Sequence, residues 1–201
     1  MKKGFTLVEI LVVISVLSVA GVIILTIFTR TLKGNNKAQI LSVIKQNGQA
    51  VLENMDKTIR GADNVVCISP DNKTLVVAQG GIYTRYRFVA PIPDTANGLI
   101  QQANPIQPDT GDNSDIKLFK DNVCTDPMGT DTHGGNLINI LTDTDLQSGV
   151  SVENGSFNKN PQSGFKDTIT INFQLAHALK APPAVAGQID PVTFQTTIQL
   201  R

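Results

Sequence analysis

Residues 5–60 are predicted to form one helix with two different halves. From residue 10 to residue 28 the chain carries no charge, and its only polar side chains are Ser15, Ser18 and Thr26. A helix of this length spans about 28 Å, the thickness of a bilayer's hydrocarbon core. After Arg30 the apolar positions instead recur at helical spacing; they are Ile40, Leu41, Ile44, Val51, Leu52, Met55 and Ile59. No proline occurs from residue 5 to residue 69, so one nearly continuous helix over 5–60 is expected.

The remainder of the chain shows the two-residue alternation of strands, interrupted by turn residues. Between Thr168 and Leu175 every second residue is apolar, which predicts a strand with one buried face. The links 71–73 and Gly80-Gly81 predict hairpins. We expect strands at 64–68, 74–79, 82–89, 116–119, 137–141, 150–157, 168–176 and 192–200, and loops at 90–114 and 179–191. The predicted fold class is α+β, with a long N-terminal helix packed against an antiparallel β-sheet.

Composition narrows the function classes. The chain has 17 basic and 17 acidic residues, so it lacks the Lys/Arg excess of a general nucleic-acid binder. Hydrophobic residues make up 41% of the chain, which argues against disorder. Cys67 and Cys124 are the only cysteines. They can form one disulfide in an oxidising compartment, and they remain two thiols in the cytoplasm.

The N-terminal apolar run allows three ordinary interpretations. Lys2 and Lys3 precede it, so a membrane anchor would keep its N-terminus in the cytoplasm. A signal peptide cleaved after Ala20 would be followed by polar sequence, but the apolar run continues. A buried core helix is rarely this long and uniform. None of the three explains Glu9, because a carboxylate at the centre of a membrane helix costs roughly 2.5–3.5 kcal/mol on insertion scales.

The stretch KGFTLVEILVVISVL resembles the start of type IV prepilins and the related pseudopilins. The resemblance implies that a prepilin peptidase cleaves after Gly4 and that the new N-terminus, Phe5, is N-methylated. It also implies that Glu9 pairs with the Phe5 amine of a neighbouring subunit, so that each charge neutralises the other in low dielectric. The alternative is that Glu9 extends to the lipid headgroups.

The same resemblance implies a domain organisation and a location. Residues 1–4 would be the leader, 5–30 the transmembrane and filament-core half of the helix, 31–61 its amphipathic half, and 62–201 a β-rich extracytoplasmic domain with the pilin-like roll. The chain would be a single-pass inner-membrane protein that later enters a pilus or pseudopilus. Its partners would be the prepilin peptidase, other pilins or pseudopilins, the inner-membrane assembly platform and, before assembly, membrane lipid. Export would favour the Cys67–Cys124 disulfide.

A second resemblance concerns the kind of pilin. ENMDKTIRGADNV, GVSVENGSF and FQTTIQLR look like segments of J-type minor pseudopilins and W-type minor pilins. The helix-breaking proline common in the membrane half of major pilins is absent here. The expected function is a minor, tip-proximal subunit of a type IV pilus or of a type II secretion or DNA-uptake pseudopilus. The alternatives are a pilin-like adhesin or DNA-binding receptor acting through residues 90–136, and an N-terminally anchored secreted enzyme.

Other chemistry has little support in the sequence. Cys124 and His133 could form a thiol–imidazole pair, but no third group that would orient them is recognisable, so we expect no enzyme activity. Asp109, Asp112 and Asp115 lie in a polar loop and are the candidate calcium ligands. Calcium needs six to eight oxygens and no EF-hand pattern is present, so solvated aspartates and no cofactor are the expectation.

Overall fold

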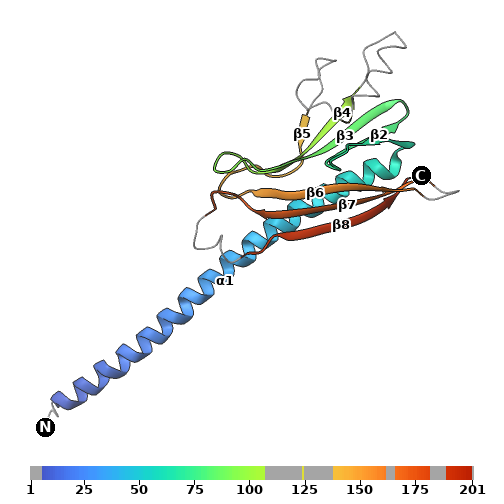
Figure 1. Cartoon of the computed structure of the whole chain (residues 1–201). Coiled ribbons are helices and arrows are strands. Elements are labelled where there is room, and N and C mark those ends of the chain that lie inside the picture. The colour runs from blue at the N-terminus through green and yellow to red at the C-terminus, as the bar shows by residue number, and fades with distance from the viewer. Residues whose placement is uncertain (1–5, 107–123, 125–137, 162–165, 182–188, 201) are drawn as a thin grey trace. The chain divides into compact units, whose positions relative to one another are not determined.

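A computed structural model describes residues 6–106, 124, 138–161, 166–181 and 189–200 of the chain (Figure 1). One helix, α1 (Leu7–Gly61), precedes all the strands. The chain divides into two compact units, residues 1–39 and residues 40–201, and α1 contributes to both. The α+β class predicted from the sequence is confirmed.

The strands form two antiparallel sheets, where the sequence predicted one. The five-stranded sheet has the order β1-β2-β3-β4-β5, and the three-stranded sheet has the order β6-β7-β8. The first sheet contains β1 (Asn64–Ile68), β2 (Thr74–Gln79), β3 (Ile82–Val89), β4 (Leu99–Ile106) and β5 (Ile138–Ile140). The second contains β6 (Val150–Asn160), β7 (Thr168–His177) and β8 (Val192–Gln199).

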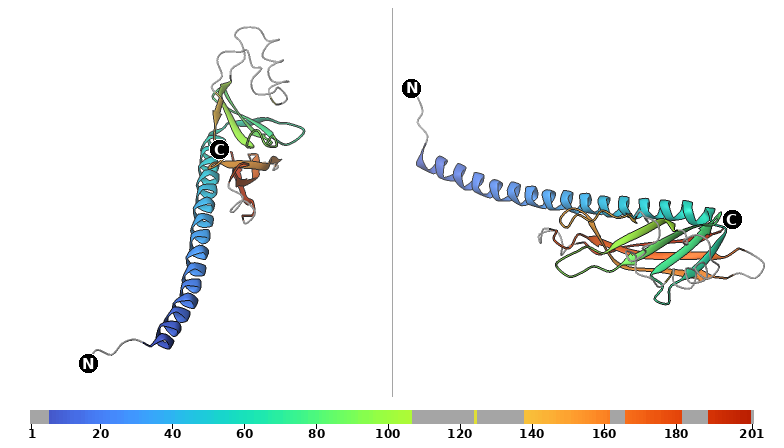
Figure 2. Two further views of the ribbon diagram at one scale, coloured as in Figure 1. Left: turned by 90° about the vertical axis from the view of Figure 1, so that its left-hand side faces the viewer. Right: turned by 90° about the horizontal axis from the view of Figure 1, so that it is seen from above.

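The second half of α1 lies along one side of the strands, as the right-hand view of Figure 2 shows. Its buried residues are spaced three or four apart, which confirms the amphipathic pattern; they are Ile44, Gly48, Val51, Met55 and Ile59. They share one core with apolar residues of both sheets, including Leu75, Phe88, Ile100, Phe157, Ile171, Phe173 and Ile198. The core therefore holds the helix and the two sheets together.

Gly48 of α1 lies directly against the ring of Phe194 on β8. A Cβ atom at this position would lie 2.2 Å from Cζ of Phe194, far inside van der Waals contact. The sequence predicted only that Gly48 weakens the helix, since glycine costs about 1 kcal/mol relative to alanine there. The structure shows that the absent side chain makes room for the Phe194 ring.

Both predicted hairpins are confirmed. β1 pairs antiparallel with β2, and Asn72 in their link has a φ of 58°. β2 pairs antiparallel with β3, with Gln79 opposite Ile82. Between those two residues Gly80 and Gly81 have φ values of 57° and 82°. Two successive positive φ angles are what a two-residue hairpin turn matched to strand twist requires.

The predicted loop over 90–114 was wrong for β4, which occupies Leu99–Ile106. Pairing with β3 overrides the polar and proline-containing sequence of this segment. The register shifts at the place where Pro105 occurs: Tyr83 pairs with Ile106 and Arg85 with Ala103. Such a bulge accommodates a residue without a backbone N–H, so proline did not exclude a strand here.

The other predicted strands agree closely with the structure. β1, β2 and β3 have the predicted bounds, and β5, β7 and β8 differ by one residue at one or both ends. β6 continues three residues beyond the prediction, to Asn160, because its polar end still pairs with β7. The strand expected at 116–119 lies outside the described residues.

Candidate functional site

The helix begins with reciprocal hydrogen bonds between Thr6 and Glu9. The backbone N–H of Glu9 donates to Oγ1 of Thr6 at 3.3 Å. In return, the backbone N–H and the hydroxyl of Thr6 each donate to Oε2 of Glu9, both at 3.0 Å. This is a capping box, which satisfies backbone N–H groups that the first helical turn leaves without partners.

The capping box gives Glu9 a local role that our sequence reasoning missed. The signal was present, since TLVE matches the capping pattern of threonine followed three residues later by glutamate. Only Oε2 takes part in these bonds, and Oε1 accepts no hydrogen bond from any residue that the structure describes. The Glu9 carboxylate can therefore cap its own helix through Oε2 and still present Oε1 to a cation.

The first half of α1 is apolar on every side. Its large apolar side chains from Leu7 to Leu32 are between 46% and 77% exposed. Burying such a side chain stabilises by roughly 1.5–3 kcal/mol. A helix that is apolar all round belongs in a membrane or in the core of a larger assembly. Residues 7–61 form a helix long and apolar enough, in its first half, to cross a membrane.

The few polar side chains in this segment satisfy themselves within the helix. The hydroxyls of Ser15, Ser18 and Thr26 each donate to a backbone carbonyl three or four residues earlier, all at 2.8 Å. Thr29 and Thr31 make the same kind of bond. Hydroxyls paired in this way can enter an apolar environment without an unsatisfied donor. They are therefore compatible with the apolar surroundings that the rest of the segment requires.

Comparison with known proteins assigns this N-terminal region to a family motif. Residues 1–25 match the family model described as the prokaryotic N-terminal methylation motif. No curated protein and no solved structure matches the chain. Residues 1–25 thus carry the N-terminal signature of type IV prepilins and pseudopilins, and this signature lies at the start of the apolar helix. The motif implies processing by a prepilin peptidase and assembly with other pilins.

The predicted cleavage and methylation sites, Gly4 and Phe5, lie outside the described residues. Thr6, the first described residue, follows Phe5 directly and its N–H bonds to Glu9. The carboxylate of Glu9 is therefore held at the end of the helix where processing would create a new amine.

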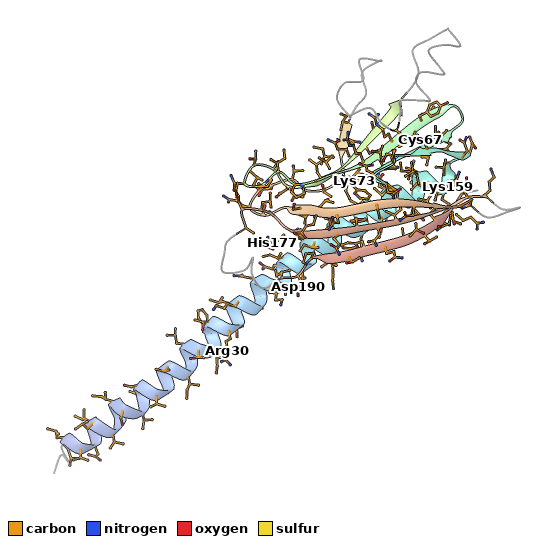
Figure 3. All side chains as sticks on the ribbon, in the orientation of Figure 1. Arg30, Cys67, Lys73, Lys159, His177 and Asp190 are labelled. Carbon is orange, nitrogen blue, oxygen red and sulfur yellow. A yellow bond between two sulfur atoms is a disulfide. The ribbon has the colours of Figure 1, made fainter. Side chains whose placement is uncertain are left out.

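A disulfide joins Cys67 of β1 to Cys124, with 6.2 Å between their Cα atoms (Cys67 is labelled in Figure 3). Cys124 packs in a small cluster with Val76 and Ala103, on the face of the five-stranded sheet away from the main core. The bond closes a sequence separation of 57 residues and anchors Cys124 to β1. Cys124 is then not a free thiol, which removes the nucleophile of the thiol–imidazole pair considered above.

The calcium candidates Asp109, Asp112 and Asp115 lie outside the described residues, as does His133. Among the residues that the structure does describe, no group of three or more His, Cys, Asp or Glu side chains could hold a metal ion. Asp145 stabilises a turn, because its Oδ1 accepts hydrogen bonds from the backbone N–H groups of Gln147 and Ser148 at 2.9 and 2.7 Å. Those hydrogen bonds lower the pKa of Asp145.

A buried polar bridge fixes α1 against the five-stranded sheet. The hydroxyl of Tyr86 on β3 donates to Oδ1 of Asn54 on α1 at 3.1 Å and accepts from Nε2 of Gln102 on β4 at 3.2 Å. Tyr86 is fully buried, and this burial raises its pKa to about 12. The bridge keeps a polar tip satisfied inside the core, which favours one orientation of the helix on the sheet.

Proposed function

We propose that this chain is a minor pilin or pseudopilin, a structural subunit near the tip of a type IV pilus or of a type II secretion or DNA-uptake pseudopilus. The N-terminus lies on the cytoplasmic side before assembly, and the sheet domain lies outside the membrane. The disulfide fits an extracytoplasmic domain, because such bonds persist in oxidising compartments. The resemblance to J-type and W-type proteins supports the minor role.

The proposal rests on the position of the charged Glu9 carboxylate at the start of an apolar helix. Cleavage after Gly4 would leave a cationic amine at Phe5, next to side chains that favour lipid or a filament core. The Glu9 carboxylate lies in the same layer, with Oε1 not engaged in the capping box. Pairing between subunits neutralises both charges where an unpaired charge is costly. The charge pair then acts as a register for side-by-side packing of helices.

Two substitutions separate this intersubunit role from the capping role. Glu9→Gln removes the charge but keeps a residue that serves at the third position of a capping box. Thr6→Ala keeps the charge but removes the capping hydroxyl, at a cost of about 1 kcal/mol in helix stability. Each variant is expressed as the full chain, and the subunit content of sheared filaments is measured beside the N-terminal peptide mass.

We expect both variants to lose residues 1–4 and to carry a methyl group on Phe5. Glu9→Gln should be depleted from filaments at least tenfold, whereas Thr6→Ala should assemble within about twofold of the wild type. Normal assembly of Glu9→Gln together with failure of Thr6→Ala would reduce Glu9 to a capping residue and contradict the charge pair. A filament in which this subunit is the main, evenly distributed component would contradict the minor, tip-proximal role.

A further inference from the structure

The two sheets have four edge strands, and three of these edges are protected. Edge strands expose unpaired backbone groups that can pair with another chain, so proteins usually shorten, bend or cover them. β5 has only three residues, and β1 has a register shift and carries the disulfide. β6 is covered on its outer side, where Val152 N–H donates to the Gly98 carbonyl and Phe157 N–H to that of Asn72, at 2.9 and 2.8 Å.

The fourth edge, β8, has none of these protections among the residues that the structure describes. It is the outermost strand of the three-stranded sheet (Figure 1), and its sequence VTFQTTIQ contains no charge, proline or glycine. It pairs with β7 over its whole length without a register shift. A long, uncharged edge with an unbroken register and many β-favouring residues is the kind of edge that accepts another strand.

The register identifies which backbone groups face the open edge. Leu200 N–H donates to the Asp167 carbonyl on the β7 side at 3.2 Å. Backbone groups alternate sides along an antiparallel strand, so the even-numbered residues of β8 bond to β7 and the odd-numbered residues face outward. The outward-facing residues are Thr193, Gln195, Thr197 and Gln199. Within the described parts of the chain, no backbone hydrogen bond reaches this outer edge.

The solvent face of this sheet adds a chemical restriction on any partner. Four rows of paired residues cross the three strands on that face, and every side chain is an uncharged amide or hydroxyl. The rows are Asn154–Gln174–Thr193, Ser156–Asn172–Gln195, Asn158–Thr170–Thr197 and Asn160–Thr168–Gln199. The opposite face of β8 presents Val192, Phe194, Thr196 and Ile198 to the core side. A strand that extends both faces would alternate uncharged polar and apolar residues.

We propose that the outer edge of β8 receives an extended strand from a neighbouring pilin-like subunit, which lengthens the three-stranded sheet across the subunit boundary. Main-chain hydrogen bonds to the odd-numbered residues would supply the contact, and the neutral polar face would select a strand without charges. The inference rests on the proposed function, because it needs a neighbouring subunit in a filament. It goes beyond helix packing by adding a contact through the sheet domain.

Substitution at Gln195 tests the backbone contact separately from the side-chain contact. Gln195→Pro removes an outward N–H and fills its place with a ring, while every β7–β8 backbone bond is kept; proline is tolerated on an edge in that orientation. Gln195→Ala removes the side chain but retains the N–H and is the matched control. Both full-length variants in detergent should unfold within a few degrees of the wild type, which shows that the domain remains folded.

In cells, we expect both variants to be processed at Gly4, with Gln195→Pro depleted from filaments at least tenfold and Gln195→Ala present near the wild-type level. Hydrogen exchange should show the odd-numbered amides of β8 protected in filaments and exchanging freely in the detergent-solubilised subunit. Equal incorporation of both variants, equal loss of both, or unchanged exchange would overturn strand addition. A wild-type chain that is neither processed nor found in filaments would instead overturn the proposed function itself.

Discussion

Gly155 on β6 occupies a position where one added methyl group should destabilise the domain. A Cβ atom there would lie 2.3 Å from Cγ of Phe88, on β3 of the other sheet. Phe88 is 3% exposed and cannot move freely, since its ring stacks on Phe157 at 4.6 Å and lies 5.9 Å from Phe173. We therefore expect Gly155→Ala to force apart the two sheets at their aromatic contact.

The magnitude follows from the contact distance. Carbon atoms in contact prefer about 3.5–4.0 Å, so the new methyl group and the ring must separate by more than about 1 Å. Overpacking of this kind costs roughly 1–3 kcal/mol. Alanine recovers roughly 0.5–1 kcal/mol of the conformational entropy that glycine loses in a strand. The net loss should be about 1–2 kcal/mol, which lowers the melting temperature by roughly 2–8 °C for a domain of this size.

The assay is urea and thermal unfolding of the full chain in detergent, followed by circular dichroism. Ser156→Ala is the matched control, because Ser156 is the next residue and lies on the opposite face, paired with Asn172. Its effect should stay within about 0.5 kcal/mol. A Gly155→Ala variant as stable as the wild type, or more stable, would refute the packing argument at this position.

Three further predictions concern the helix, the polar bridge and the disulfide. Gly48→Ala should destabilise the wild type by about 1 kcal/mol, because overpacking against Phe194 outweighs the gain in helix propensity. In a Phe194→Ala background the same substitution should stabilise the protein by about 1 kcal/mol. If unfolding measurements on this double-mutant cycle gave the same sign in both backgrounds, steric coupling between the two residues would be excluded. Because the folded state raises the pKa of Tyr86 from 10.0 to about 12, the unfolding free energy of the wild type should fall by roughly 2–3 kcal/mol as the pH rises from 10 to 12. Tyr86→Phe should be about 1 kcal/mol less stable than the wild type at neutral pH and should lose less stability over this alkaline range. Parallel curves of unfolding free energy against pH for the two proteins would contradict the role assigned to the Tyr86 hydroxyl. Replacing Cys67 with serine should lower the unfolding free energy by about 2–4 kcal/mol. A reductant should lower the unfolding free energy of the wild type to the same value and leave that of the variant unchanged. If the reductant did not change the stability of the wild type, the bond between Cys67 and Cys124 would not stabilise the fold.

Sequence alone was sufficient where the controlling interactions are local. The motif from Lys3 to Glu9 and the apolar run behind it lie in one contiguous stretch, so they could be identified without a fold. The turn residues Gly80-Gly81 set their own backbone angles, and the hairpin followed. The apolar spacing in the second half of α1 predicted its buried face, because helix geometry repeats every 3.6 residues.

The tertiary structure decided the features that depend on residues far apart in sequence. β4 became a strand because β3 pairs with it, although its own residues favour a loop. The place of Gly48 beneath Phe194 and of Gly155 beneath Phe88 arises only when helix and sheets pack together. The division into two sheets, and with it the open edge of β8, likewise depends on long-range pairing. Local propensity cannot report such contacts, because their free energy comes from neighbours that the chain brings together only on folding.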